Sequence, residues 1–306
     1  MRIPFITYAK LWVVIGALVV AASVVAVAVW QLKPGIDFTG GSLMEITFSQ
    51  NRPDVSALAQ VLVKNQVTDP VLQNSGDAGF IIRSGNLDET QHQQVLAALK
   101  KTFEIQDTKL REERFETIGP AISSQLKQRS IWGVILVNIS IILYLAYAFR
   151  RVARPVSSWI YGLLAIVALF HDVLIVLGVF AVLGHFRGVE VDTAFVVAVL
   201  TVLGFSVNDT IVVYDRIREN LLRRTATDFA TMVNNGLNDT LARSLNTTFT
   251  AVLPLLALFF FGGATVHYFV LALLVGMVSG AYSSIFIASP LLVLIEQWQR
   301  SRRATA

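Results

Sequence analysis

Six long apolar blocks dominate the pattern of hydrophobic and polar positions along the chain. Each is near or above the roughly 20 residues that an α-helix needs to cross the hydrocarbon of a bilayer. They predict transmembrane helices over Leu11–Trp30, Ile131–Phe149, Ser157–Leu183, Thr193–Tyr214, Leu245–Phe261 and Tyr268–Ile295. The first block is too long for the apolar core of a signal peptide and no small-residue cleavage site follows it, so we expect an uncleaved first helix.

The polar segment between the first and second blocks alternates between strand and helix patterns. We expect, in order, a strand Ser42–Phe48, a helix Val55–Gln66, strands Val67–Asn74 and Phe80–Ser84, a helix from about Asn86 to Thr102, and a strand Ile105–Ile118. Gly119-Pro120 ends this domain, and Ile122–Ser130 has the pattern of a short amphipathic helix leading into the second span. The order β-α-β-β-α-β is that of the ferredoxin-like arrangement.

The predicted fold class is a polytopic α-helical membrane protein with six transmembrane helices and one extracytoplasmic α+β ferredoxin-like (βαββαβ) domain between helices 1 and 2. Residues 1–33 would hold a cytoplasmic N-terminus and the first helix, and residues 34–120 the α+β domain. Residues 121–306 would hold helices 2–6 and a cytoplasmic C-terminus.

Composition agrees with a membrane protein, since 54% of the residues are hydrophobic, 15% are charged and the mean hydropathy is +0.61. The absence of cysteine excludes a disulfide framework, a thiolate metal site and a cysteine nucleophile. The net charge of +4 does not point to nucleic acid, because the basic residues follow the membrane topology instead.

Thirteen basic residues fall in four segments that six spans place on one side of the membrane, and they are Arg2, Lys10, Arg150, Arg151, Arg154, Arg216, Arg218, Arg223, Arg224, Arg243, Arg300, Arg302 and Arg303. The short connections on the other side, 184–192 and 262–267, hold only Arg187. The positive-inside rule therefore predicts that both termini are cytoplasmic. Attraction to anionic lipid is a secondary interpretation.

Asp209 is the residue in this pattern that most needs an explanation. Insertion of an aspartate at the centre of a membrane helix costs roughly 2.5–3.5 kcal/mol, so such groups usually bind ions or protons, or pair with cations. Helical spacing predicts that Thr201, Asn208 and Asp209 share one face of the fourth helix, with Gly204 allowing a close neighbour. The alternative is a structural carboxylate that fixes helix packing.

Arg243, at the entry to the fifth helix, is the candidate counter-ion, because it approaches the depth of Asp209 from the same side. Alternatively it extends to the interface as a long basic side chain. The adjacent pair His171 and Asp172, near the middle of the third helix, has the groups of a proton relay or of a hydrogen-bonded latch between helices.

Three further patterns have mainly structural interpretations. Gly276, Ser279, Gly280, Ser283 and Ser284 give the sixth helix a small-residue face, which indicates a packing surface that could also receive a partner. The run Asp215–Asn220 is typical of a solvated membrane flank. The segment Pro34–Gly41 predicts a tight turn, with glycines permitting unusual φ angles, that directs the chain into the first strand.

Motifs of common enzymes are missing from the sequence. It contains no G-x-x-x-x-G-K-[ST] phosphate loop, no H-E-x-x-H and no G-x-S-x-G elbow. The run Gly204–Asp209 also lacks the G-x-G-D pattern of intramembrane aspartyl proteases. We therefore expect a protein that is not an enzyme and that draws energy from a gradient or a partner.

The runs Gly35–Ser42, Phe170–Val173 and Gly204–Asn220 resemble the SecF family of protein translocase subunits, in the resistance–nodulation–division superfamily. The likeness covers the whole chain, and the third run is its most specific part. The motif positions with a structural role in the resemblance are Gly35, Asp37, Gly40, Gly41, Asp215, Arg216, Arg218 and Glu219.

The resemblance implies an accessory subunit of protein export in the bacterial inner membrane. Such a subunit pairs with a separate SecD chain and assists the SecYEG channel, using the proton-motive force and no bound cofactor. The carboxylate of the family falls on Asp209, beside Asn208, and its fifth-helix arginine on Arg243. Unfolded preprotein would contact the domain over residues 42–118.

Two alternatives to proton-coupled protein export are open at this point. One is a proton-driven exporter of small molecules or lipids from the same superfamily. The other is a passive scaffold whose polar residues only lock its helices to SecD.

Overall fold

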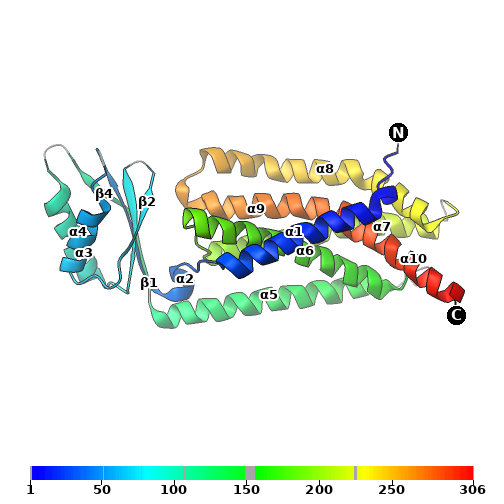
Figure 1. Cartoon of the computed structure of the whole chain (residues 1–306), viewed down its shortest axis with the longest axis horizontal. Helices are drawn as coiled ribbons and strands as arrows, with labels where there is room; N and C mark the ends of the chain where they lie inside the picture. Colours follow the sequence, from blue (N-terminus) through cyan, green and yellow to red (C-terminus); the bar gives the residue numbers. More distant parts are fainter. Residues whose placement is uncertain are drawn as a thin grey trace. The chain divides into compact units, whose positions relative to one another are not determined.

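The computed structural model describes residues 2–50, 52–76, 78–105, 108–148, 156–223 and 226–305. The chain forms two compact units, shown in Figure 1. We call Met1–Lys33 with Trp132–Ala306 the membrane unit, and Pro34–Ile131 the sheet domain. Four basic residues used in the topology prediction lie outside the described residues, namely Arg150, Arg151, Arg154 and Arg224.

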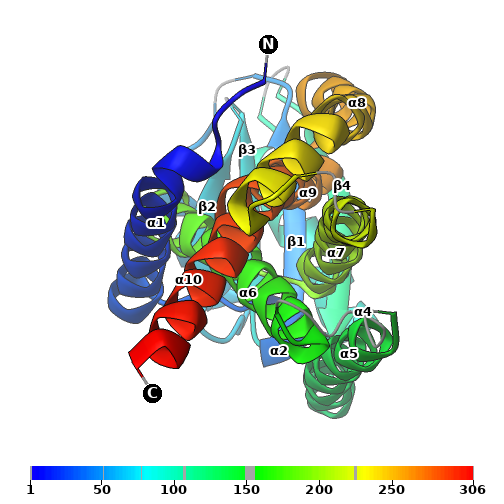
Figure 2. The same cartoon turned by 90° about the vertical axis from the view of Figure 1, so that its right-hand side faces the viewer.

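Six helical segments of the described residues are long and apolar enough to cross a membrane, which confirms the predicted number. The helices are α1 (Ala9–Trp30), α5 (Pro120–Ala148), α6 (Ser158–Arg187), α7 (Thr193–Leu222), α8 (Phe229–Phe261) and α9 (Ala264–Ser283). A short 3₁₀ turn, η1 (Ile6–Tyr8), precedes α1. Helix α9 continues through a π-helical segment, η2 (Ser284–Ala288), into α10 (Ser289–Thr305). Figure 2 looks along this bundle.

The amphipathic helix predicted over Ile122–Ser130 and the second span form one continuous helix, α5. Pro120 is its first residue, a position where the missing N–H of proline costs nothing and its fixed φ suits the helix. The predicted end of the α+β domain at Gly119-Pro120 therefore coincides with the start of this long helix.

The predicted fifth span, Leu245–Phe261, is too short, since α8 begins sixteen residues earlier at Phe229. Asp228 caps this start by accepting a hydrogen bond from the Thr231 amide at 3.1 Å. The added stretch holds three asparagines and several hydroxyl residues besides Asp239 and Arg243, so a hydropathy window does not detect it. Hydropathy reports the membrane-facing part of a helix and not its polar extension.

The polar start of α8 binds the N-terminal segment of the chain. Asn238 accepts a hydrogen bond from the Ile3 amide at 2.8 Å and donates to the Ile3 carbonyl at 2.9 Å. Asn234, one turn earlier, accepts from the Ile6 amide at 3.2 Å and also donates to the Ile3 carbonyl. Residues that precede the first span thus lie along the first turns of α8.

Helices α7 and α9 approach closely at two glycines. A Cβ atom at Gly276 would lie 2.2 Å from Val202 Cγ2, and one at Gly280 would lie 2.8 Å from Ser206 Cβ. Both distances are too short for a side chain without movement of the backbone. The small-residue face predicted for the sixth helix is therefore a packing surface within this chain.

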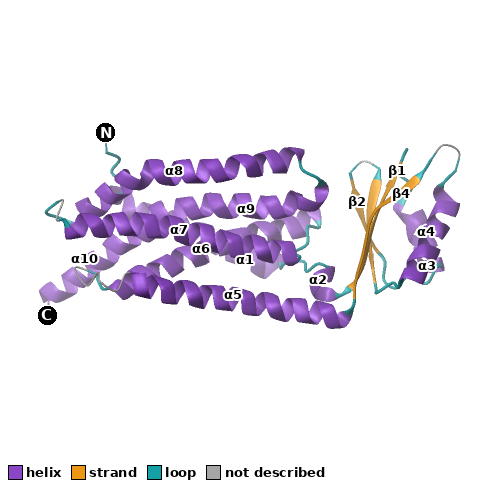
Figure 3. Ribbon diagram, turned by 180° about the vertical axis from the view of Figure 1, so that it is seen from behind, coloured by secondary structure: helices purple, strands orange, loops and turns teal. Residues whose placement is uncertain are grey.

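The sheet domain has the predicted element order β-α-β-β-α-β. Its elements are β1 (Gly41–Phe48), α3 (Val55–Lys64), β2 (Val71–Ser75), β3 (Gly79–Ser84), α4 (Glu89–Phe103) and β4 (Leu110–Ile118). The four strands form an antiparallel sheet in the order β2-β3-β1-β4, so β3 lies between β1 and β2. Helices α3 and α4 cover one face of this sheet (Figure 3).

Alternation along β1 is confirmed, because Met44, Ile46 and Phe48 are all buried against the helices. The second strand begins at Val71, four residues later than predicted. Pro70 directly precedes it, and a proline cannot donate a ladder hydrogen bond. The strand therefore begins after Pro70, although the apolar pattern already starts at Val67.

The glycine-rich segment before β1 is the predicted tight turn. A single helical turn, α2 (Ile36–Thr39), closes on Gly35, whose carbonyl accepts hydrogen bonds from the Phe38 and Thr39 amides. Gly40 and Gly41 then adopt φ of +75° and +117°. A Cβ atom at Gly41 would lie 2.5 Å from the Ser84 carbonyl oxygen. Only glycine fits this approach of β1 to β3.

We predict that Gly41→Ala destabilises the β1–β3 pairing by at least about 1–3 kcal/mol, because alanine strains this φ and meets the Ser84 carbonyl. Hydrogen exchange of the β1 and β3 amides in the purified protein should accelerate accordingly. Gly119→Ala is the matched control, since a Cβ there meets nothing within 4 Å. Equal exchange in both variants would contradict the assigned role.

Candidate functional site

Asp209 lies on α7 inside the membrane unit and is 6% exposed. The helix starts at a capped position, where the Asp192 side chain accepts a hydrogen bond from the Phe195 amide at 2.7 Å. Asp209 Oδ1 accepts a hydrogen bond from the Ser244 hydroxyl of α8 at 2.6 Å. Its Oδ2 is buried and has no hydrogen-bond partner among the described residues. An unpartnered carboxylate oxygen in an apolar bundle favours binding of a proton.

The predicted shared face of Thr201, Asn208 and Asp209 is wrong. Thr201 and Asn208 are exposed on this chain, as is Gly204, whereas Asp209 points inward. At about 100° per residue, positions seven apart differ by only about 20°, but positions eight apart differ by about 80°. Asn208 therefore lies beside Asp209 in sequence but on another side of α7.

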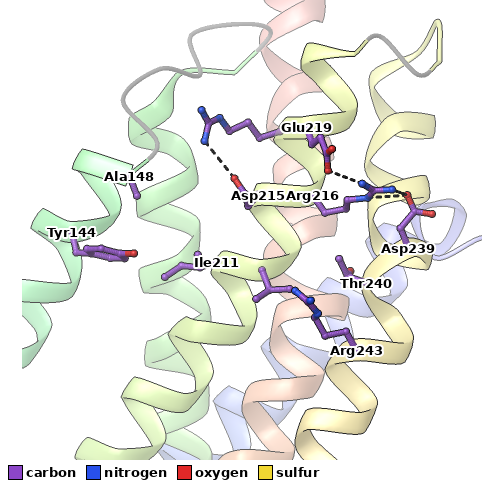
Figure 4. Close-up of a pocket in the computed structure, with 11 residues that line it drawn as sticks. Tyr144, Ala148, Ile211, Asp215, Arg216, Glu219, Asp239, Thr240 and Arg243 are labelled. Atoms are coloured by element: carbon purple, nitrogen blue, oxygen red, sulfur yellow. Dashed lines mark hydrogen bonds and ion pairs between the residues drawn. The ribbon is translucent and has the colours of Figure 1, made fainter.

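Arg243 does not form the predicted ion pair with Asp209 in the part of the chain that the structure describes. Its side chain is exposed, and the next residue, Ser244, contacts the carboxylate instead. Arg243 lines a pocket of about 620 Å³ between the C-terminal end of α7 and the N-terminal part of α8, together with Asp215, Arg216, Glu219 and Asp239 (Figure 4).

The Asp215–Asn220 run supplies the charged wall of this pocket. Arg216 pairs with Glu219 at 2.6 Å on its own helix and with Asp239 of α8 at 2.9 Å. Arg218 pairs with Asp215 at 3.4 Å. Pairs that are this exposed contribute about 0–1 kcal/mol each. Of the three, the Arg216–Asp239 pair joins α7 to α8, and the other two lie within α7.

His171 and Asp172 form a polar centre on α6. The two side chains are in contact, His171 Nδ1 to Asp172 Oδ1, at 3.0 Å. Asp172 also accepts hydrogen bonds from Ser279 at 2.8 Å, Ser283 at 2.8 Å and Ser206 at 2.5 Å. Asp172 is fully buried, and His171 Nε2 is buried without a described partner. The geometry matches a latch between α6, α7 and α9.

A pair of hydroxyl groups lies where α9 continues as the π-helical segment η2. The hydroxyls of Thr210 and Ser284 are 2.8 Å apart, and the Tyr214 hydroxyl donates to the Ala288 carbonyl at 3.1 Å. A π-helical turn releases a carbonyl from the regular helix ladder and is frequent at functional sites. The π segment thus packs against α7 within a turn of Asp209.

The serines that hold both carboxylates were not identified as site residues from the sequence. Ser206 and Thr210, like Ser279 and Ser283, are four residues apart and share a helix face, which is a readable signal. Ser244 has no such signal, because its partner lies on another helix. Among the described residues no group of three or more His, Cys, Asp or Glu side chains could hold a metal ion.

Comparison with known proteins connects this arrangement to one family. A model described as "Protein export membrane protein SecD/SecF, C-terminal" matches residues 98–298, and one described as "SecD/SecF GG Motif" matches residues 31–51. The chain is 43% identical over 288 residues to the protein translocase subunit SecF of Thermobaculum terrenum, covering 91% of this chain and 89% of that protein. It is 35% identical to SecF of Synechocystis, covering 98% and 96%.

The fold is also that of a solved relative. The crystal structure of SecDF from Thermus thermophilus, described as a translocon-associated membrane protein, matches with a TM-score of 0.83 at 31% identity. The match covers 97% of this chain and 39% of that one, so the chain spans about two fifths of the solved protein. With a family model over most of its length and relatives of similar size, the chain belongs to the SecF family of protein translocase subunits, which are accessory membrane proteins of Sec protein export.

Proposed function

We propose that this chain uses the proton-motive force to assist preprotein export, and that Asp209 is the group that binds the proton. The observation that carries the proposal is the buried Oδ2 of Asp209, which has no hydrogen-bond partner among the described residues. An anionic oxygen there lacks compensation, and a proton removes the charge. No bound cofactor is needed, since the gradient supplies the energy.

Protonation would change the contact between α7 and α8. The ionised carboxylate accepts the hydrogen bond of Ser244, whereas protonated Oδ2 becomes a donor that requires an acceptor of its own. Arg243 precedes Ser244 and is free of described ion pairs, so it would turn toward ionised Asp209 and leave when the proton binds. Asn208, on the adjacent side of α7, would face the partner subunit.

The proposed partners are a separate SecD chain, the SecYEG channel and unfolded preprotein. The solved SecDF relative is much longer than this chain, which supports a second chain that supplies the remainder. We assign preprotein contact to the sheet domain, and the proton at Asp209 would shift the packing of α8 within the membrane unit. This is a population shift driven by a charge at a helix interface.

We further propose the bacterial inner membrane as the location, with both termini cytoplasmic and the sheet domain on the opposite side. The distribution of basic residues between the connections supports this orientation. The polar start of α8 and the charged pocket would then lie at the cytoplasmic face.

Asp209→Asn should reduce proton-driven export to the level of cells that lack the chain, because asparagine cannot take up the proton. Export of a reporter preprotein into oriented vesicles, with and without a proton gradient, measures this. Asp215→Asn is the matched control, since among the described residues the exposed Asp215 side chain pairs with Arg218 on its own helix, and this variant should export normally. Gradient-dependent export by the Asp209 variant would favour the passive scaffold.

Ser244→Ala should lower proton-driven export about tenfold. A hydrogen bond to a charged group contributes about 1.5–3 kcal/mol, and about 1.4 kcal/mol corresponds to a factor of ten. Thr248→Val serves as control one turn further along α8, because the Thr248 hydroxyl has no described partner and valine keeps its shape. If both variants exported equally well, the Ser244 contact would have no part in coupling.

Single cysteines should report the topology without background, since the chain has none of its own. We expect a membrane-impermeant thiol reagent, added from outside to cells with a permeabilised outer membrane, to label Gln60→Cys on α3. The same reagent should label Ser301→Cys only after lysis. Both positions are exposed in the structure. The reverse labelling would overturn the proposed orientation.

A further inference from the structure

Asp172 has all acceptor positions of its carboxylate occupied. Each oxygen contacts two donors, Oδ1 with His171 and Ser279, and Oδ2 with Ser206 and Ser283. An ionised carboxylate offers about four such positions, and a protonated one would have to use one oxygen as a donor. The geometry therefore fits a permanent anion.

Asp209 differs from Asp172 in this respect, although both are buried in the same bundle. One oxygen of Asp209 accepts a hydrogen bond from Ser244, and the other has no described partner. Binding a proton would displace one of the hydrogen-bond donors at Asp172, whereas at Asp209 it would occupy an oxygen that has no described partner. The two carboxylates are thus suited to different tasks.

The donors to Asp172 come from three helices. Ser206 belongs to α7, while Ser279 and Ser283 belong to α9, so the anion on α6 joins all three. At the same level α7 and α9 touch through Gly280 and Ser206 without room for a further carbon atom. Side-chain bonds and backbone contact together make α6, α7 and α9 one block.

Helix α8 is attached to this block differently. Its buried residues all lie between Phe229 and Ser244, and none lies in Leu245–Phe261. In the membrane core Ser244 joins it to Asp209 on α7, and nearer its start Asp239 pairs with Arg216. The start of α8 also packs closely on α7, since a Cβ atom at Gly236 would lie 2.9 Å from Ile217. The bond that a proton at Asp209 would disturb therefore lies at the boundary between this packed start of α8 and the stretch Leu245–Phe261, which has no buried residue.

We infer that Asp172 is a positioning residue that stays ionised and anchors a rigid α6–α7–α9 block, against which α8 moves when Asp209 takes up a proton. This inference rests on the proposed role of Asp209 as the proton-binding group. It assigns His171 to the latch, where its Nδ1–H donates to the Asp172 carboxylate, and not to the transfer of the proton.

Other titratable groups face this region from the packed helices. They are His171 and Asp172 on α6, Tyr214 on α7, Arg243 on α8, Tyr282 on α9 and Tyr144 on α5. Asp172 and Asp209 are the buried carboxyl groups of this region, whereas Asp215, Glu219 and Asp239 line the pocket beside Arg243 and are exposed or half-buried. Infrared spectroscopy can therefore separate them, since a protonated carboxyl group has a carbonyl band that the other side chains lack.

The first experiment records infrared difference spectra between mildly alkaline and mildly acidic pH, on the protein co-purified with SecD in lipid nanodiscs. We expect a protonated-carboxyl band that Asp209→Asn removes and that Ser244→Ala shifts. Ser283→Ala should leave that band region unchanged, because it alters a donor to Asp172 only. A band that shifts in Ser283→Ala would show that Asp172 is protonated and would overturn the inference.

The second experiment measures distances between spin labels on paired cysteines. The moving pair is Leu163→Cys on α6 with Leu253→Cys on α8, and the control pair is Leu163→Cys with Val278→Cys on α9, all at exposed positions. We expect the moving pair to change by about 1–2 Å or more on acidification, with no change in Asp209→Asn. The control pair should stay constant.

The outcomes separate the inference from the proposed function. If the wild-type difference spectrum showed no protonated-carboxyl band, the role of Asp209 itself would be contradicted. An intact Asp209 band with an equal change in both label pairs would refute only the rigid block. An intact band with no change in the moving pair would refute only the movement of α8.

Discussion

The membrane unit depends on how a buried carboxylate is compensated in an apolar surrounding. Asp172 is fully buried, and such a charge is tolerated only where hydrogen-bond donors replace water. The donors come from α7 and α9, so satisfying one charge fixes the relative positions of three helices. Packing and polarity are therefore not separate features here, because the small residues that permit close approach also carry the hydroxyl groups.

The carboxylate of Asp209 is compensated by hydrogen bonds less completely than that of Asp172. A bundle that supplies four contacts to one carboxylate leaves one oxygen of the other without a hydrogen bond among the described residues. If every buried charge were equally satisfied, none could change its protonation without breaking the bundle. In the proposed mechanism, a fully bonded anchor at Asp172 would let the charge at Asp209 change while α6, α7 and α9 keep their packing.

The fold of the sheet domain depends on local backbone geometry and not on a buried charge. Two glycines with positive φ bring the chain from a single helical turn into β1, and one of them sets the spacing to β3. The core on one face of the sheet then depends on ordinary strand alternation. Helix α5 begins at Pro120, just after β4 ends at Ile118, so the chain runs from this domain into the membrane unit through one continuous helix.

The sequence by itself determined the six spans, the β-α-β-β-α-β order and the unfavourable free energy of placing Asp209 in an apolar helix. Hydropathy, strand alternation and the presence of a charge in an apolar segment are local properties. The sequence did not determine which way Asp209 faces, or that Ser244 and not Arg243 contacts it. Those features depend on the rotation of each helix about its axis. That rotation is set by contacts such as Gly280 with Ser206, between residues far apart in the chain, which only the tertiary structure brings together.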